Sequence, residues 1–151
     1  MFASHAWGVE QPNHKHVALL VRELERIGLS VWFDDERLSG EIHRKISEGL
    51  RDSFIYLACI SQDFLEKIED ASSNDGVDWC DFEFTASIDS HGKRRSVCVV
   101  CEPELLSPTT WFGPVRTALS GLLYADYSSA SKLEAAALRI KREVEAKMRI
   151  D

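Results

Sequence analysis

The chain has 151 residues, of which 44% are hydrophobic and 28% charged, and its formal net charge is −7. This composition indicates one folded domain with a substantial core and excludes a disordered chain. The negative charge disfavours nucleic acid as a partner, because phosphate backbones repel it. No apolar stretch approaches the roughly 20 residues of a membrane span, and the N-terminus lacks the pattern of a signal peptide. We therefore expect a cytoplasmic protein that binds neither nucleic acid nor a membrane.

The first half of the chain alternates short apolar strands with helical patterns. Residues 1–4 (MFAS) predict a first strand. The helix that follows can be capped by Asn13 and ended by Gly28, and its apolar residues keep helical spacing, namely Val17, Leu20, Val21, Leu24 and Ile27. Residues 29–35 (LSVWFDD) predict a second strand, and residues 37–41 (RLSGE) a turn. One face of a second helix is then marked by Ile42, Ile46 and Leu50.

The second half of the chain repeats this alternation. Residues 54–61 (FIYLACIS) are nearly all apolar, as in a strand covered on both faces, and Ser61 can cap the next segment. A polar loop, EDASSNDG, precedes a helix predicted over residues 78–88. Two further strands are predicted at 96–102 (SVCVVCE) and 121–127 (GLLYADY). The last helix begins with a capping box, Ser131-x-x-Glu134, and its apolar residues are Leu133, Ala137, Ile140, Val144 and Met148.

Five strands, each followed by helical sequence, predict an α/β fold with a parallel sheet and helices on both faces. Such sheets bind ligands beyond the carboxyl ends of their strands. The residues after positions 4, 33, 60 and 100 are therefore the candidates for a site. The sequence contains no P-loop, no dinucleotide fingerprint and no G-x-S-x-G elbow. Ser61 stands where a phospho-acceptor receiver domain needs an aspartate, which argues against that class.

The cysteines and histidines give little sign of a metal or redox site. Cys98 and Cys101 form a C-x-x-C, but side chains three apart on a strand point to opposite faces. A zinc site needs a second close cysteine pair, which this sequence lacks. We expect His14 and His16 to be a solvated helix start, since positions two apart cannot face one ligand. His5 differs because it follows the first strand, at the predicted ligand edge.

Trp79 and Glu83 are four positions apart on a predicted helix, so that they share one face. Two interpretations are open. The pair is either an aromatic wall with a catalytic carboxylate, or a core tryptophan beside an exposed helix glutamate. Spacing alone favours the second interpretation, because such neighbours are common on helices.

Four stretches together resemble a TIR (Toll/interleukin-1 receptor) domain. They are FASHAWG at residue 2, LERIGLSVWFDDERLSGEIHRKISEGLRDS at residue 24, CISQDF at residue 59 and WCDFE at residue 79. The resemblance runs from residue 2 to about residue 127. It implies a flavodoxin-like fold, with five parallel strands in the order 2-1-3-4-5 and helices on both faces. We expect residues 1–151 to form a single TIR domain that is a module of a larger protein.

The resemblance implies two functions. Some TIR domains cleave NAD between nicotinamide and ribose in immune or cell-death type signalling, and others act only as signalling adaptors through TIR–TIR contacts. In the enzymatic case NAD is the substrate, with no other cofactor and no metal, and the domain forms a homo-oligomer on activation. The product is ADP-ribose or a cyclic form of it. A third class, a nucleoside ribosyl-hydrolase on a related fold, would prefer free nucleosides to NAD.

By the same resemblance Glu83 matches the catalytic glutamate, and Trp79 forms part of the pocket wall. The loop after the first strand contributes His5, Ala6 and Trp7, although Trp7 is equally well placed in a core. Three further assignments have structural alternatives. Asp34 helps to fix the ribose or caps a turn, and Ser61 contacts substrate or caps a helix. The BB loop, which contacts the next subunit in the enzymes or is an ordinary connection, matches Arg37, Leu38, Ser39 and Gly40.

Overall fold

The centre of the molecule is a parallel sheet. The computed structural model describes residues 1–6, 12–33, 49, 53–71, 79–90 and 92–149. Within these residues the sheet has five strands in the order β2-β1-β3-β4-β5, and every neighbouring pair is parallel. The strands are β1 (Phe2–Ser4), β2 (Trp32–Phe33), β3 (Tyr56–Ile60), β4 (Ser96–Val100) and β5 (Tyr124–Asp126). The flavodoxin-like α/β fold expected from the sequence is confirmed.

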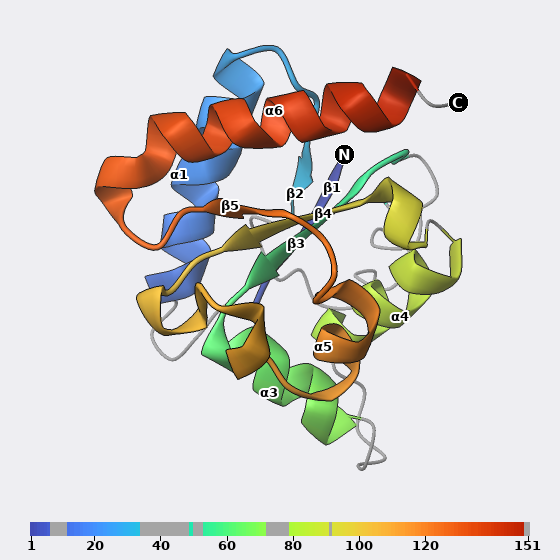
Figure 1. Cartoon of the computed structure of the whole chain (residues 1–151). Coiled ribbons are helices and arrows are strands. Elements are labelled where there is room, and N and C mark those ends of the chain that lie inside the picture. Colours follow the sequence, from blue (N-terminus) through green and yellow to red (C-terminus); the bar gives the residue numbers. More distant parts are fainter. Residues whose placement is uncertain (7–11, 34–48, 50–52, 72–78, 91, 150–151) are drawn as a thin grey trace, which may run out of the picture.

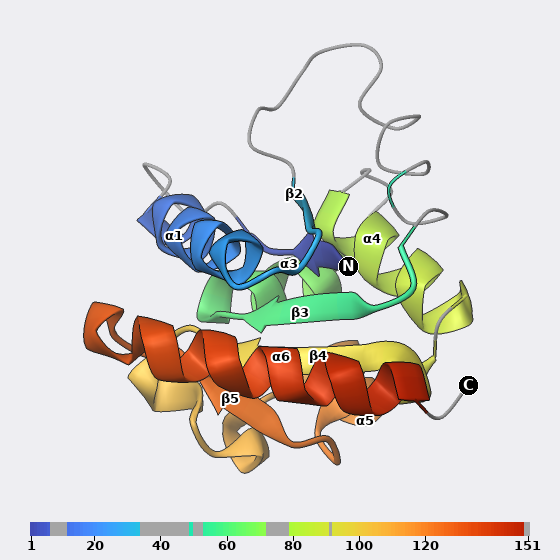
Figure 2. The same cartoon turned by 90° about the horizontal axis from the view of Figure 1, so that it is seen from above.

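Helices cover both faces of this sheet. Figure 1 shows α1 and α6 on one side of the strands and α3, α4 and α5 on the other, and Figure 2 shows the same arrangement from above. The bounds are α1 (Pro12–Arg26), α3 (Gln62–Ala71), α4 (Trp79–Ser90), α5 (Gly113–Leu119) and α6 (Leu133–Arg149). In the described ranges, no helix combines the length and the apolar character needed to cross a membrane. The predicted turn at 37–41 and the helical face of Ile42, Ile46 and Leu50 lie outside the described residues.

Two buried clusters, one on each face of the sheet, follow from the alternation of side chains along the strands. Phe2, Tyr56 and Cys98 belong to the cluster that includes core residues of α3, α4 and α5. Ala3, Leu57 and Cys101 belong to the cluster that includes core residues of α1 and α6. Cys98 and Cys101 therefore lie on opposite faces, as the strand pattern predicts.

Two of the predicted helix ends are confirmed. Gly28 follows α1 with a φ of 104°, a conformation that favours glycine because it has no Cβ. Ser61 caps α3, because its Oγ accepts a hydrogen bond from the Phe64 backbone N–H at 3.1 Å. The cap fixes the start of α3 at the carboxyl end of β3.

Two details of the predicted helix pattern are wrong. Helix α1 already begins at Pro12, so Asn13 lies inside it, and the Asn13 side-chain amide donates to the Ala6 carbonyl. A 3-10 turn over Ala130–Lys132 precedes α6, and within it the Ser131 hydroxyl bonds to the Ser129 hydroxyl at 3.0 Å instead of forming a capping box. Met148 lies on α6 as predicted, although its side chain is 57% exposed.

Candidate active site

A buried carboxylate lies at the carboxyl end of β1. Helix α4 packs against β1, and Glu83 on this helix is only 6% exposed. The hydroxyl of Ser4, the last residue of β1, donates to Glu83 Oε2 at 2.6 Å. This distance is typical of a charge-assisted O–H···O⁻ bond. The interpretation of Glu83 as an exposed helix glutamate is therefore wrong.

The position of Glu83 follows from the pattern of α4. Helical spacing places Glu83 and Ser87 on one face, and both side chains are buried. The next residue, Phe84, is buried in the cluster that also contains Phe2 of β1. The apolar residues of α4 thus hold the helix against the sheet, and the two polar residues are carried into the interior with it.

His5 directly follows β1 and is paired with His14 of α1. The distance from His5 Nε2 to His14 Nδ1 is 2.7 Å, and both rings stack with Phe33 of β2. The two side chains are 5% and 7% exposed, respectively. The prediction that His14 belongs to a solvated helix start is wrong. His14 lies three positions before Val17, so it falls on the buried face of α1.

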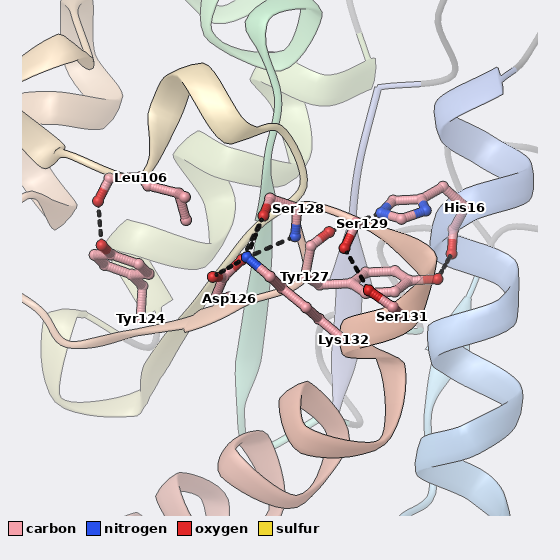
Figure 3. Close-up of polar contacts among 9 residues, drawn as sticks. All are labelled: His16, Leu106, Tyr124, Asp126, Tyr127, Ser128, Ser129, Ser131 and Lys132. Atoms are coloured by element: carbon pink, nitrogen blue, oxygen red, sulfur yellow. Dashed lines mark hydrogen bonds and ion pairs between the residues drawn. The ribbon is translucent and has the colours of Figure 1, made fainter.

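His16 is also bonded to the protein rather than solvated. Its Nε2 donates to the Tyr127 carbonyl at 2.8 Å, and the Tyr127 hydroxyl donates to the His16 carbonyl at 2.8 Å. Figure 3 shows the two side chains facing each other between α1 and the segment after β5. Their rings stack with centroids 3.7 Å apart. Burial is the main cause that raises the pKa of Tyr127 to about 12, so its hydroxyl remains a donor.

A cavity of about 650 Å³ lies beside this pair, at the carboxyl ends of β3 and β4. Ser61 lines it, together with three carboxylate side chains, Asp63, Glu66 and Glu102. Glu102 Oε1 accepts the backbone N–H of Gln62 at 2.7 Å. The volume suits a small molecule. The carboxylates disfavour phosphate groups at this end and suit neutral or cationic ones.

Asp126, at the end of β5, forms an ion pair close to the same cavity. Lys132 Nζ lies 2.7 Å from Asp126 Oδ2 and 3.0 Å from the hydroxyl of Ser128, which lines the cavity (Figure 3). Burial acts to raise the pKa of Asp126, but hydrogen bonds from Lys132 and Ser128 outweigh it and lower the pKa. The carboxylate is thus held ionised at this corner of the sheet.

Cys59 and Cys98 are buried, unreactive thiols. A hydrogen bond with Cys101, followed by burial, raises the pKa of Cys59, and burial raises that of Cys98 to about 12. Thiolates are the reactive form of cysteine, so these residues act as small hydrophobic groups. Among the residues that the structure describes, no three His, Cys, Asp or Glu side chains are grouped to hold a metal ion.

The structure places the predicted site residues that it describes in different surroundings. At the end of β1, Glu83 lies on the side of α4, whereas the His5 ring lies on the side of α1. Ala6 is buried in the core cluster, and Ser61 lines the cavity at β3. Trp79 is the first residue of α4, but its side chain is outside the described part. The other predicted residues also lie outside it, namely Trp7, Asp34, Arg37, Leu38, Ser39 and Gly40.

Two residues of this arrangement were missed by the sequence prediction. Ser4 shares a face of β1 with Phe2, so a hydroxyl is placed on an apolar face, where it needs a partner. His14 extends the apolar spacing of α1 by one turn toward its start. In both cases the sequence places a polar residue at a position where the periodicity predicts an apolar one.

The comparisons with known proteins bear on the family of the chain. The family model described as "TIR domain" matches residues 1–140, which is most of the chain. The comparison with curated proteins gives no match. The chain thus belongs to the TIR domain family.

Proposed function

We propose that this TIR domain is an NAD glycohydrolase, which cleaves NAD to nicotinamide and ADP-ribose or a cyclic form, in cytoplasmic signalling of the immune or cell-death type. The observation that carries the proposal is the buried carboxylate of Glu83, held at the carboxyl end of β1. Parallel sheets bind ligands at this edge. Burial of a charge is unfavourable, so a buried carboxylate at this edge is a candidate for a catalytic role.

One carboxylate can suffice for this reaction. The bond between the ribose carbon and the pyridinium nitrogen breaks with its electron pair going to nitrogen, and nicotinamide leaves as a neutral molecule. No general acid is needed for the leaving group, unlike an ordinary glycoside, which usually takes two carboxyls. Positive charge develops on the ribose, and the Glu83 carboxylate stabilises it in a largely dry site. Water then bonds to the ribose carbon and releases a proton, which gives ADP-ribose.

The partner of this domain in the proposal is a second TIR domain. The BB-loop match at residues 37–40 supports contacts between copies, and in enzymatic relatives such contacts complete the pocket. Turnover by the isolated domain should then rise faster than linearly with protein concentration. A strictly linear dependence across the range in which the protein associates would contradict this part of the proposal.

The choice of substrate tests the function itself. Concentrated protein is incubated with NAD and, separately, with free nucleosides, and the products are separated by chromatography. Release of nicotinamide from NAD, with nucleosides intact, is the expected result. Faster cleavage of nucleosides would contradict the proposal in favour of a nucleoside hydrolase. No cleavage of either, under crowding conditions that drive association, would contradict it in favour of an adaptor.

A further inference from the structure

The hydroxyl of Ser4 is held on a buried strand inside the sheet. Ser4 ends β1, where it pairs with Ala58 of β3, and β1 lies between β2 and β3 in the sheet. Its side chain is fully buried, on the face that also holds Phe2. Because Ser4 is paired with β3 and the residues before it are paired on both sides, the backbone has little freedom to move the hydroxyl.

The hydrogen bond between Ser4 and Glu83 gives a partner to two buried polar groups. A buried hydroxyl and a buried carboxylate each cost free energy unless they are hydrogen-bonded. The 2.6 Å bond joins the hydroxyl, as donor, to one oxygen of the carboxylate. It also links a strand to a helix 79 residues further along the chain. The orientation of the Glu83 carboxylate is therefore set by the sheet as well as by α4.

We propose that Ser4 is a positioning residue for Glu83, holding the carboxylate ionised and oriented toward the substrate ribose. This inference rests on the proposed function, since it assigns Ser4 a role in the same reaction. A donated hydrogen bond favours the charged form of a carboxylate. A group that is already oriented needs no reorganisation as charge develops on the ribose, which is how fixed charges accelerate such steps.

Two substitutions of Ser4 separate this role from packing. Ser4→Ala keeps nearly the same volume and removes the hydroxyl, so that Glu83 loses this donor. Ser4→Cys keeps a side chain of similar shape with a weaker donor. Ser96→Ala is the matched control, because Ser96 is also a fully buried strand serine. Its hydroxyl donates to the Gly92 carbonyl at 2.7 Å, at the start of β4.

The experiment measures nicotinamide release from NAD by the whole chain in these variants, with Glu83→Gln as reference. For Ser4→Ala we expect kcat to fall about 10- to 100-fold, the range for loss of a hydrogen bond to a charged group, with KM changed less than about twofold. The acid limb of its pH profile should move to higher pH. Ser4→Cys should retain more turnover than Ser4→Ala, and Ser96→Ala should keep the kcat of the wild type.

The outcomes distinguish the two proposals. Wild-type kcat and pH profile in folded Ser4→Ala, beside an inactive Glu83→Gln, would overturn the role of Ser4 and leave the proposed function standing. Equal turnover by the wild type and Glu83→Gln would instead overturn the proposed function. An equal loss of kcat in Ser4→Ala and Ser96→Ala, both still folded, would also overturn the inference, because it would mark a general effect of lost buried hydroxyls.

Discussion

His5 Nε2 and His14 Nδ1 lie 2.7 Å apart, and this bond joins the end of β1 to the first turn of α1. One ring must donate and the other accept, so the two imidazoles cannot both be doubly protonated while the bond exists. Both rings stack on Phe33 of β2. The pair thus connects three elements next to Ser4, the residue that bonds to Glu83.

Replacement of His14 by alanine should therefore destabilise the fold. His14→Ala removes a buried ring and leaves His5 without this partner, and we expect the free energy of unfolding to fall by about 2–4 kcal/mol. The control is Lys15→Ala, one position further along α1, where the side chain is exposed. Urea unfolding followed by circular dichroism measures both. Equal midpoints for the two variants would contradict a structural role of the histidine pair.

Replacement of Ser87 should instead raise the free energy of unfolding. Its hydroxyl is fully buried on α4 and has no hydrogen-bond partner within the part of the chain that the structure describes. Ser87→Ala should raise the free energy of unfolding by about 1 kcal/mol, because it removes an unpaired polar group and adds a better helix former. Ser96→Ala, which removes a bonded hydroxyl, should lower it by a similar amount. The same unfolding measurement on both variants checks this, and a loss of stability in Ser87→Ala would contradict it.

Cys98 should resist alkylation in the folded protein. Burial raises the pKa of Cys98 to about 12, so almost none of it is thiolate at neutral pH, and the side chain is inaccessible. We expect iodoacetamide to leave Cys98 unmodified in the native state and to modify it in urea. Peptide mass spectrometry after each treatment gives the result. Labelling of native Cys98 as fast as in urea would show that the β4 region opens readily.

The ion pair between Asp126 and Lys132 predicts a small, pH-dependent stabilisation. Against the opposing effect of burial, hydrogen bonds from Lys132 and Ser128 lower the pKa of Asp126 in the folded protein. The stabilisation is therefore complete above the carboxyl's pKa in the unfolded chain and is lost as the pH falls through its pKa in the folded protein. Because the two side chains are 41% and 38% exposed, we expect less than about 1 kcal/mol.

The variant Lys132→Met tests the direction of this pH dependence. Its free energy of unfolding should be slightly below that of the wild type at neutral pH, and the difference should vanish at strongly acidic pH, where Asp126 is protonated. Unfolding curves at the two pH values give the comparison. A difference that grows on acidification would contradict the assignment.

The sheet could be predicted from the sequence because strands buried on both faces leave nearly continuous apolar runs, as at residues 54–61 and 96–102. The starts of α1 and α6 were harder, because several polar residues there compete to cap each helix. The residue type of Asn13 is typical of a helix cap, yet its side-chain amide donates a hydrogen bond to the Ala6 carbonyl. Such a choice depends on a contact between residues seven positions apart, which the helical pattern does not contain.

The same limit applies to the candidate site. Glu83 could be selected from the sequence because it lies within a stretch that resembles the family, but its burial could not, since exposed glutamates have the same spacing from an aromatic residue. The bond from Ser4 spans 79 positions and exists only because α4 packs on β1. Likewise, His14 and His16 looked solvated as neighbours on one helix, whereas the folded chain gives each a different partner.

The most direct test of the central claim compares NAD turnover by the wild type, Glu83→Gln and Glu145→Gln. Glu145 is an exposed glutamate of α6, on the other face of the sheet, so its variant controls for the loss of one negative charge. Nicotinamide release is followed by chromatography at high protein concentration, with folding checked by circular dichroism. We expect a loss of about 100-fold or more in Glu83→Gln and wild-type turnover in Glu145→Gln. Undiminished turnover in folded Glu83→Gln would contradict it.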